Sequence, residues 1–159
     1  MTALPGELGP LLLSVDHVGL AVPDLDAAIA FHSDVLGLRL VHEETNHDQG
    51  VREAMMAVGD DPGPDAACIQ LLAPTGPESV LARFLDRRGP GLQQLAYRVT
   101  DVDQVAVALR ARGLRVLFEG SRPGTAGSRI NFVHPEDTGG VLIELVQPPG
   151  EPGRSKDPA

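Results

Sequence analysis

The sequence lacks most of the residues that mark a disulfide-rich, secreted or membrane protein. Its 159 residues include one cysteine, Cys68, which excludes an internal disulfide framework and a cysteine zinc site. No apolar run approaches the roughly 18 residues of a membrane span. The short apolar patch Leu11–Leu13 has no basic residue before it, unlike a signal peptide. We therefore expect a cytoplasmic protein with no membrane partner.

Positive charge and aromatic rings are also scarce. Acidic residues outnumber basic ones by 22 to 13, the formal net charge is −9, and the aromatic residues are four phenylalanines and one tyrosine. Nucleic-acid binding needs a basic surface, and binding of single strands also needs rings for stacking. The composition therefore argues against a nucleic-acid partner and favours a small-molecule ligand. The length fits one domain, or two small repeats that share a core.

What the chain does contain is an internal repeat. Residues 92–117 align with residues 15–40 at an offset of 77, and the strands 142–146 and 68–72 correspond at an offset of 74. A strand, an Asp-x-Asp helix start, an apolar helix, a glycine and a second strand recur in that order. The repeat predicts an α+β fold of two βαβββ modules related by a pseudo-two-fold axis, with a shared cleft between them.

The expected boundaries follow from turn residues and helix caps. We expect a flexible N-terminal extension at 1–14, the first module at 15–75, a helical linker at 76–91, the second module at 92–146 and a disordered tail at 147–159. The first module should hold strands near 15–22, 38–44, 51–58 and 66–73. Asp24 and Asp101 are the expected N-caps of the two repeated helices, and a strand should follow the second helix at 114–117.

Four polar side chains fall at matched positions of the repeats: His17 matches Gln94, and Gln70 matches Glu144. Strand alternation places His17 among small residues, on the face opposite the bulky ones. Glu144 lies in the apolar run Val141–Val146, where an ionised carboxylate is costly unless it is paired or binds a metal. One imidazole, one carboxylate and two amides suit an octahedral divalent metal. A hydrogen-bonded core histidine with structural glutamines is the alternative that spacing leaves open.

Glu53 is a second candidate for chemistry. It shares a strand face with Val51, Met55 and Ala57. Burial on an apolar face raises the pKa of a carboxyl group, which suits a general base near neutral pH. The alternative is a salt bridge between Glu53 and a neighbouring arginine, and the residues alone favour that alternative slightly.

Several segments together resemble the methylmalonyl-CoA epimerase family of the vicinal-oxygen-chelate (glyoxalase-like) superfamily. They are DHVGLAV (16–22), QGVREAMM (49–56), IQLLAPT (69–75), FLDRRGPGLQQLAYRV (84–99) and SRINFVHPEDTGGVLIELV (128–146). The resemblance implies a cupped mixed sheet and a homodimer. It also implies a divalent metal ion, with Co²⁺ or Mn²⁺ preferred and Ni²⁺, Mg²⁺ or Zn²⁺ as alternatives. The resemblance places the catalytic base at Glu53 and the metal ligands at His17, Gln70, Gln94 and Glu144.

The sequence departs from the family motif at Gln94. The family has a histidine there, so an amide oxygen replaces an imidazole and should bind later transition metals more weakly. Two smaller departures are His32, where the family often has tyrosine, and Glu136, where it often has lysine.

The implied activity is the interconversion of (R)- and (S)-methylmalonyl-CoA by metal-assisted removal of the α-proton through an enolate. The phosphates of coenzyme A need positive charge nearby. We predict that Arg122 and Arg129 supply it, and further candidates are Arg83, Arg87 and Arg88. The glycine-rich stretch 122–128 should form a loop over the mouth of the cleft. Two alternatives remain open: a diverged metalloenzyme acting on another acyl-CoA or a secondary metabolite, and a metal-free ligand-sequestering protein.

Overall fold

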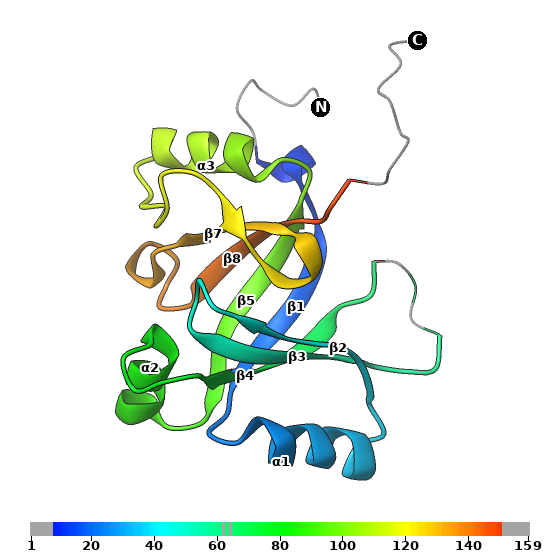
Figure 1. The fold of residues 1–159 in the computed structure, drawn as a ribbon. Coiled ribbons are helices and arrows are strands. Elements are labelled where there is room, and N and C mark those ends of the chain that lie inside the picture. The colour runs from blue at the N-terminus through cyan, green and yellow to red at the C-terminus, as the bar shows by residue number, and fades with distance from the viewer. Residues whose placement is uncertain (1–7, 62, 64, 151–159) are drawn as a thin grey trace.

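The computed structural model describes residues 8–61, 63 and 65–150, which build one eight-stranded mixed sheet with three helices packed against it (Figure 1). The order of the strands across the sheet is β2-β3-β4-β1-β5-β8-β7-β6. The strands are β1 (Leu12–Ala21), β2 (Arg39–Asn46), β3 (Val51–Ala57), β4 (Cys68–Pro74), β5 (Gly91–Val99), β6 (Arg122–Pro123), β7 (Arg129–Val133) and β8 (Leu142–Gln147), and the helices are α1 (Leu25–Ala30), α2 (Val80–Arg88) and α3 (Val102–Ala111).

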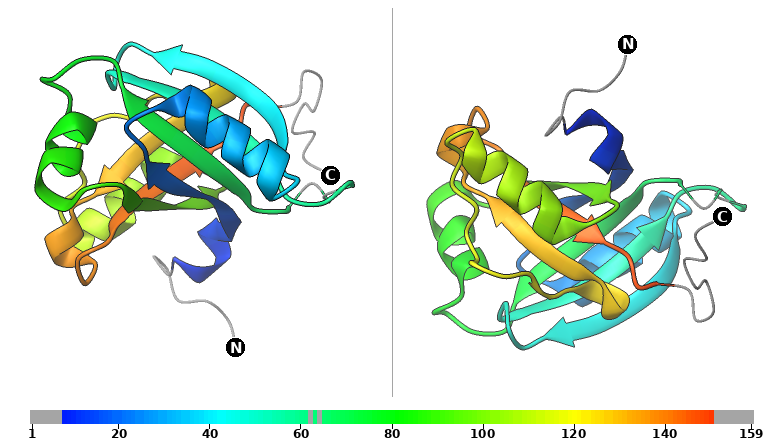
Figure 2. Two further views of the ribbon diagram at one scale, coloured as in Figure 1. Left: turned by 90° about the horizontal axis from the view of Figure 1, so that it is seen from below. Right: turned by 90° about the horizontal axis from the view of Figure 1, so that it is seen from above.

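The sheet consists of two halves with the same connectivity. Strands β1–β4 with α1 form the first half, and β5–β8 with α3 form the second. Within each half the first strand pairs in parallel with the last, and the two first strands, β1 and β5, pair antiparallel at the centre. Figure 1 shows α1 and α3 at opposite ends of the molecule, and Figure 2 shows the curvature of the sheet between them. The predicted α+β fold of two βαβββ modules is confirmed.

Both repeated helices begin at the predicted aspartates. The side chain of Asp24 accepts a hydrogen bond from the Ala27 amide, and Asp101 accepts one from the Gln104 amide, each at 3.0 Å. These bonds satisfy amides that have no partner inside the helix. Helix α1 is short and continues as a π-helical turn, Phe31–Val35, whereas α3 runs for ten residues.

The core lies on both faces of the sheet. We define the outer face as the one that packs on α1 and α3, and the inner face as the one that carries His17. On the outer face Leu25 packs on Ala54, Met56 and Leu71, while the residues of α3 pack on Val99, Val133 and Leu145. On the inner face two smaller apolar clusters flank the polar residues: Ala21, Val51, Leu72 and Leu81 in the first half, and Ala96, Ile130, Phe132 and Val146 in the second.

The strand expected at 114–117 is absent from the sheet. Only one isolated bridge, Val116 with Val133, forms there. Around this bridge the Leu117 amide donates to the Phe132 carbonyl at 2.8 Å and the His134 amide donates to the Arg115 carbonyl at 2.9 Å. The pairing ends at Phe118, where the Asn131 side chain binds the backbone: its amide donates to the Phe118 carbonyl at 2.9 Å and its oxygen accepts from the Phe118 amide at 3.0 Å. The edge strand of the second half is therefore the two-residue β6.

The first and last strands of the sheet include residues that were expected in the N-terminal extension and in the tail. Strand β1 begins at Leu12, inside the expected extension, and the Leu11 carbonyl accepts a hydrogen bond from the Thr100 amide at 3.0 Å. Gln147, expected in the tail, ends β8, and its side chain accepts a hydrogen bond from the Val102 amide at 3.0 Å. The rest of the expected extension and tail, residues 1–7 and 151–159, lies outside the described residues. No helix in the described part is long and apolar enough to cross a membrane.

Candidate metal and acid–base site

The four matched polar side chains meet at the centre of the inner face. They come from four adjacent strands, β4, β1, β5 and β8, and all four are at least nine-tenths buried. His17 Nε2 lies 2.9 Å from Glu144 Oε2. The Gln94 amide nitrogen lies 2.8 Å from Glu144 Oε2, 2.8 Å from Gln70 Oε1 and 3.3 Å from His17 Nε2. One imidazole nitrogen, a carboxylate oxygen of Glu144, the amide oxygen of Gln70 and the amide nitrogen of Gln94 therefore converge on one point.

Small residues next to these side chains make the convergence possible. Gly19 lies opposite both Gln70 and Gln94 in the strand registers, and a β-carbon at Gly19 would come within 2.5 Å of the Gln94 Cγ. The corresponding residue of the second half, Ala96, lies opposite both His17 and Glu144. Each half thus clears space with a small residue between two polar ones.

Asp16 holds the imidazole of His17 in place. His17 Nδ1 lies 2.7 Å from Asp16 Oδ2, and Arg98 donates to the other oxygen of Asp16 from Nε at 3.0 Å. Burial opposes protonation of His17, but the hydrogen bonds and charges of Asp16 and Glu144 outweigh it and raise the pKa of His17 to about 9. With Nδ1 engaged by Asp16, Nε2 is the atom presented to the site.

Glu53 lies beside the four residues, bound to one of them. Its side chain is 3% exposed, and its Oε2 accepts a hydrogen bond from the Gln70 amide nitrogen at 3.0 Å. The Gln70 amide therefore points its oxygen at the four-residue cluster and its nitrogen at Glu53. The alternative was a salt bridge between Glu53 and a neighbouring arginine. The adjacent arginine, Arg52, instead forms salt bridges with Asp26 and Glu43.

The environment of Glu53 suits a group that takes up a proton near neutral pH. Burial raises its pKa most, a hydrogen bond from Thr125 lowers it, and the nearby carboxylates of Glu44 and Glu144 raise it further, to about 7. Glu44 stands directly opposite Glu53 in the β2–β3 register. A carboxyl group whose pKa lies near the working pH is the arrangement that general-base catalysis uses.

The structure separates the two candidate arginines. The Arg122 guanidinium lies over the Phe118 ring at 4.1 Å and 3.7 Å from Asp48 in the β2–β3 turn. Arg129 alternates with Ile130 along β7, so it faces outward, where it binds Ser121 and lies 3.4 Å from Asp103 of α3. Arg122 thus reaches the first half of the sheet, and Arg129 lies on the face opposite the four polar residues.

Sequence reasoning missed two residues that bind the site, Asp16 and Thr125. The hydroxyl of Thr125 donates to Glu53 Oε1 and accepts from the Gln70 amide nitrogen at 3.2 Å. Asp16 precedes a candidate ligand directly, so the frequent pairing of a histidine ligand with a carboxylate was a usable signal. Thr125 lies in the glycine-rich stretch 122–128 that was expected over the mouth of the cleft, but no signal marks its hydroxyl group as a partner of Glu53, 72 positions away.

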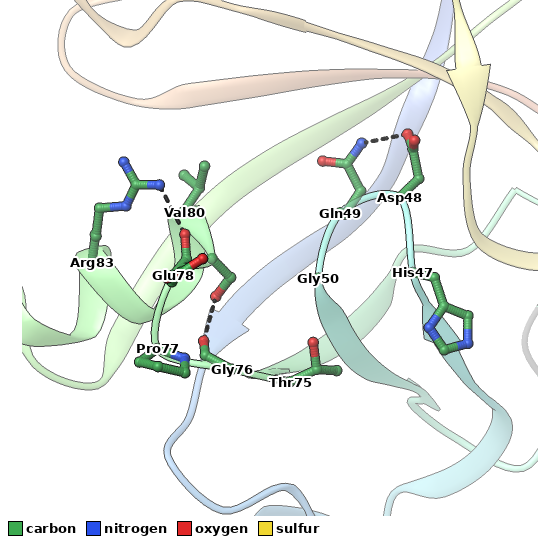
Figure 3. A pocket seen from close by; sticks show the side chains of 11 residues that line it. His47, Asp48, Gln49, Gly50, Thr75, Gly76, Pro77, Glu78, Val80 and Arg83 are labelled. Atoms are coloured by element: carbon green, nitrogen blue, oxygen red, sulfur yellow. Dashed lines mark hydrogen bonds between the residues drawn. The ribbon is translucent and has the colours of Figure 1, made fainter.

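A cavity of about 550 Å³ opens near the start of β3 (Figure 3). It lies between the β2–β3 turn and the connection from β4 to α2, and none of the four converging residues lines it. Gly50 on its wall directly precedes β3, which carries Glu53, and Arg83 of α2 also lines it. The lining residues are His47, Asp48, Gln49, Gly50, Thr75, Gly76, Pro77, Glu78, Ser79, Val80 and Arg83.

The described residues hold no group of three or more histidine, cysteine, aspartate or glutamate side chains arranged to bind a metal. The converging donors reach four only because two are glutamine amides.

Residues 16–132 match the family model of the glyoxalase/bleomycin resistance protein/dioxygenase superfamily. The chain belongs to this superfamily.

Relatives within the glyoxalase superfamily are similar over most of the chain. The mitochondrial methylmalonyl-CoA epimerase of Bos taurus is 32% identical over 150 residues, which cover 92% of this chain and 82% of that protein. The crystal structure of methylmalonyl-CoA epimerase from Mycobacterium tuberculosis matches with a TM-score of 0.83 and 55% identity, covering 94% of each chain. A Streptomyces coelicolor methylmalonyl-CoA epimerase in complex with 2-nitronate-propionyl-CoA matches with a TM-score of 0.83 and 41% identity, over 87% of this chain and 99% of that one.

Proposed function

We propose that this protein is a methylmalonyl-CoA epimerase that interconverts the (R) and (S) forms by removing and returning the α-proton. The observation that carries the proposal is the position of Glu53, a buried carboxyl group bound through Gln70 to a cluster of four donors. The similar epimerases from three organisms support the same substrate class.

The four donors fit a divalent cation, which we propose is Co²⁺ or Mn²⁺, with Ni²⁺, Mg²⁺ or Zn²⁺ as alternatives. His17 would bind through Nε2, Gln70 through its amide oxygen and Glu144 through its carboxylate. The Gln94 amide, whose nitrogen faces these three side chains, would turn over to present its oxygen. Four buried polar side chains from four strands, linked to one another by contacts of 2.8 to 3.3 Å, favour this use. A histidine ligand must be neutral, so loading of the cation should release a proton from His17.

Removal of the α-proton requires stabilisation of the negative charge that develops on the thioester oxygen. When bound, the cation supplies Lewis-acid stabilisation of that charge. Glu53, whose carboxylate is buried away from bulk water, takes the α-proton. Return of a proton to the opposite face of the planar enolate inverts the carbon.

The nucleotide end of coenzyme A should lie toward the cavity near the start of β3. Arg83 lines that cavity, and Arg122 lies 3.7 Å from Asp48, which also lines it. Both arginines can therefore supply positive charge for phosphates on the side of the molecule next to Glu53. Arg129 faces the opposite side of the sheet and is left out of this proposal.

The proposal includes a cytoplasmic location and a homodimer. The single, half-buried Cys68 is consistent with a reducing compartment. Size-exclusion chromatography with light scattering tests the homodimer, which should have twice the mass of one chain. A mass of one chain at micromolar concentration would contradict it.

The first experiment is proton NMR of methylmalonyl-CoA in D₂O with purified protein and added Co²⁺ or Mn²⁺. A metal-stripped sample and a sample without protein are the controls, since this α-proton also exchanges spontaneously. We expect metal-dependent loss of the α-proton signal well above background, and chiral analysis should then give both forms from either one.

Two other outcomes separate the alternatives. Background exchange by a protein that binds metal would favour a diverged metalloenzyme with another acyl-CoA or a secondary metabolite as substrate. Background exchange by a protein that binds no metal would favour a ligand-sequestering protein. Either outcome contradicts the epimerase proposal.

A further inference from the structure

The loop that contains Thr125 belongs to the second half of the sheet but reaches the base proposed in the first. Thr125 follows β6, and its hydroxyl group contacts two residues of the first half at once. It donates a hydrogen bond to Glu53 Oε1 and accepts one from the Gln70 amide nitrogen at 3.2 Å. Gln70 also donates to Glu53 Oε2 at 3.0 Å, so both oxygens of the carboxylate are held.

The backbone of this loop is shaped to deliver the hydroxyl group. Gly124 has no space for a β-carbon, which would collide with Ile130 and the Ser128 hydroxyl. Ala126 adopts a left-handed conformation with φ of 54°, which costs a non-glycine residue free energy. The Gly124 amide donates to the Ser128 carbonyl at 2.9 Å, and the Ser128 amide donates to the Thr125 carbonyl at 3.1 Å. These bonds close the loop on itself and fix Thr125 between its ends.

The geometry points to Thr125 as a positioning residue: we propose that its hydroxyl group fixes the carboxylate of Glu53 in the orientation that reaches the α-proton. This inference rests on the proposed epimerase function. A glutamate side chain has three rotatable bonds, and a displacement of about 1 Å at a reacting group can lower a rate by about 10². The two hydrogen bonds from Thr125 and Gln70 do not use all the lone pairs of the carboxylate, so holding Glu53 in this way does not block proton uptake.

The same hydroxyl group couples the two functions of Gln70. The oxygen of this amide faces the cation site and its nitrogen faces Glu53, and the bond to Thr125 uses the second hydrogen of that nitrogen. With both hydrogens engaged, the amide is held with its oxygen toward the cluster. The base and the proposed ligand are thereby fixed relative to each other by a residue from the other half of the molecule.

The test compares Thr125→Val, which keeps the shape but removes the hydroxyl group, with Thr125→Ser, which keeps the hydroxyl group. Thr138→Val is the matched control, because it makes the same change in the turn before β8, where the hydroxyl donates to the Pro135 carbonyl at 3.1 Å. For each variant, kcat and KM are measured with methylmalonyl-CoA, and Co²⁺ affinity and thermal stability are measured on the same preparations.

We expect Thr125→Val to lower kcat by about 10- to 100-fold while KM changes by less than about threefold. Thr125→Ser should recover kcat to within about threefold of the wild type, and Thr138→Val should keep it. Wild-type kcat in Thr125→Val would overturn the inference, and so would equal losses in the valine and serine variants, since the methyl group or packing would then be responsible.

The wild-type measurement separates this inference from the function on which it rests. An active wild-type enzyme with an equally active Thr125→Val variant overturns the role of Thr125 and leaves the epimerase proposal intact. A wild-type protein without metal-dependent exchange overturns both, because Glu53 then has no α-proton to reach.

Discussion

The two halves of the sheet share a backbone plan but carry different chemistry at equivalent positions. In the first half Met55 lies opposite Gln70, and two positions before it on β3 stands Glu53. In the second half Phe132 lies opposite Glu144, and two positions before it on β7 stands Ile130. The halves contribute two of the proposed cation ligands each, but of this equivalent pair only the first half's residue is a carboxyl group. Repetition builds the cluster of four polar side chains, and a departure from repetition supplies the proposed base.

The outer face shows a second difference between the halves. Helix α3 buries four residues against its half of the sheet, whereas in α1 only Leu25 is buried, and the chain then continues as a π-helical turn.

The edge strands of the two halves also differ in length, since β2 has eight residues and β6 has two. Because the edge of the second half is so short, the loop with Thr125 is free to cross to the first half, where the Ala126 amide donates to Glu44 at 3.4 Å. The shorter edge thus completes the site.

The largest expected effect comes from removing the carboxyl group that only the first half supplies. Glu53→Gln should lower turnover at least ~10²-fold, because general-base catalysis contributes on that scale. Ile130→Val, at the equivalent position of the second half, should stay within about threefold. Exchange of the α-proton in D₂O measures both, and similar losses in the two variants would contradict the assignment of the base.

The next effect tests the difference between the helices. Leu109, in the last part of α3, is only 9% exposed. Leu109→Ala should therefore leave a cavity in the core and lower the free energy of unfolding by on the order of 2 kcal/mol. Val35, in the π-helical turn after α1, is 67% exposed, and Val35→Ala should change stability by less than about 0.5 kcal/mol. Urea unfolding measures both. A comparable loss for Val35→Ala would mean that another molecule buries this turn in solution.

A substitution that makes the two halves more alike should strengthen metal binding, and this effect should be smaller than the losses above. Gln94→His would place imidazoles at both matched positions, 17 and 94. Imidazole is the better donor for later transition metals, so Co²⁺ affinity should rise by about tenfold. Competition with a chromogenic chelator measures the change. Weaker binding would show that position 94 contributes through its amide, as a hydrogen-bond donor to Glu144 and Gln70.

The smallest effect is a dependence of stability on pH in the metal-stripped protein. The folded pKa of Glu53 is about 7, above the ordinary value of 4.5, so the folded state binds this proton more tightly than the unfolded state does. The contribution of Glu53 to the free energy of unfolding is therefore greatest below about pH 4.5 and falls as pH rises toward 7.

Glu53→Gln should remove this dependence. Relative to the wild type, the variant should gain stability between about pH 5 and about pH 8, as measured by urea unfolding. An equal difference between the two proteins at both pH values would contradict the raised pKa. The metal-stripped form is used because a bound cation would also interact with the charge on Glu53.

Much of the site could be predicted because strand alternation and the internal repeat are both visible in the sequence itself. His17, Gln94, Gln70 and Glu144 each lie on a regular strand, so the parity of their positions places them on one face. Their convergence follows once the first and last strands of each half are paired. The metal they hold stays a prediction, since position alone does not establish coordination.

The features that could not be predicted depend on contacts between distant loops and strands. The expected strand at 114–117 forms only an isolated bridge, because the side-chain amide of Asn131 takes the backbone hydrogen bonds of the next residue, Phe118. Asparagine in a strand gives no sign of that use. The proximity of Thr125 to Glu53 depends on where a loop of the second half ends. For Glu53 itself, the residues alone slightly favour pairing with an arginine, although strand alternation places the adjacent Arg52 on the other face.

Gly19 has a consequence for how such sequences vary. Since a β-carbon at position 19 would meet the side chain of Gln94, the two positions cannot change independently. A homologue with alanine at the first should carry a shorter or differently oriented side chain at the second. In a large family alignment the pair should therefore covary, and in a mutational library the double substitutions at 19 and 94 should include functional members that neither single library contains.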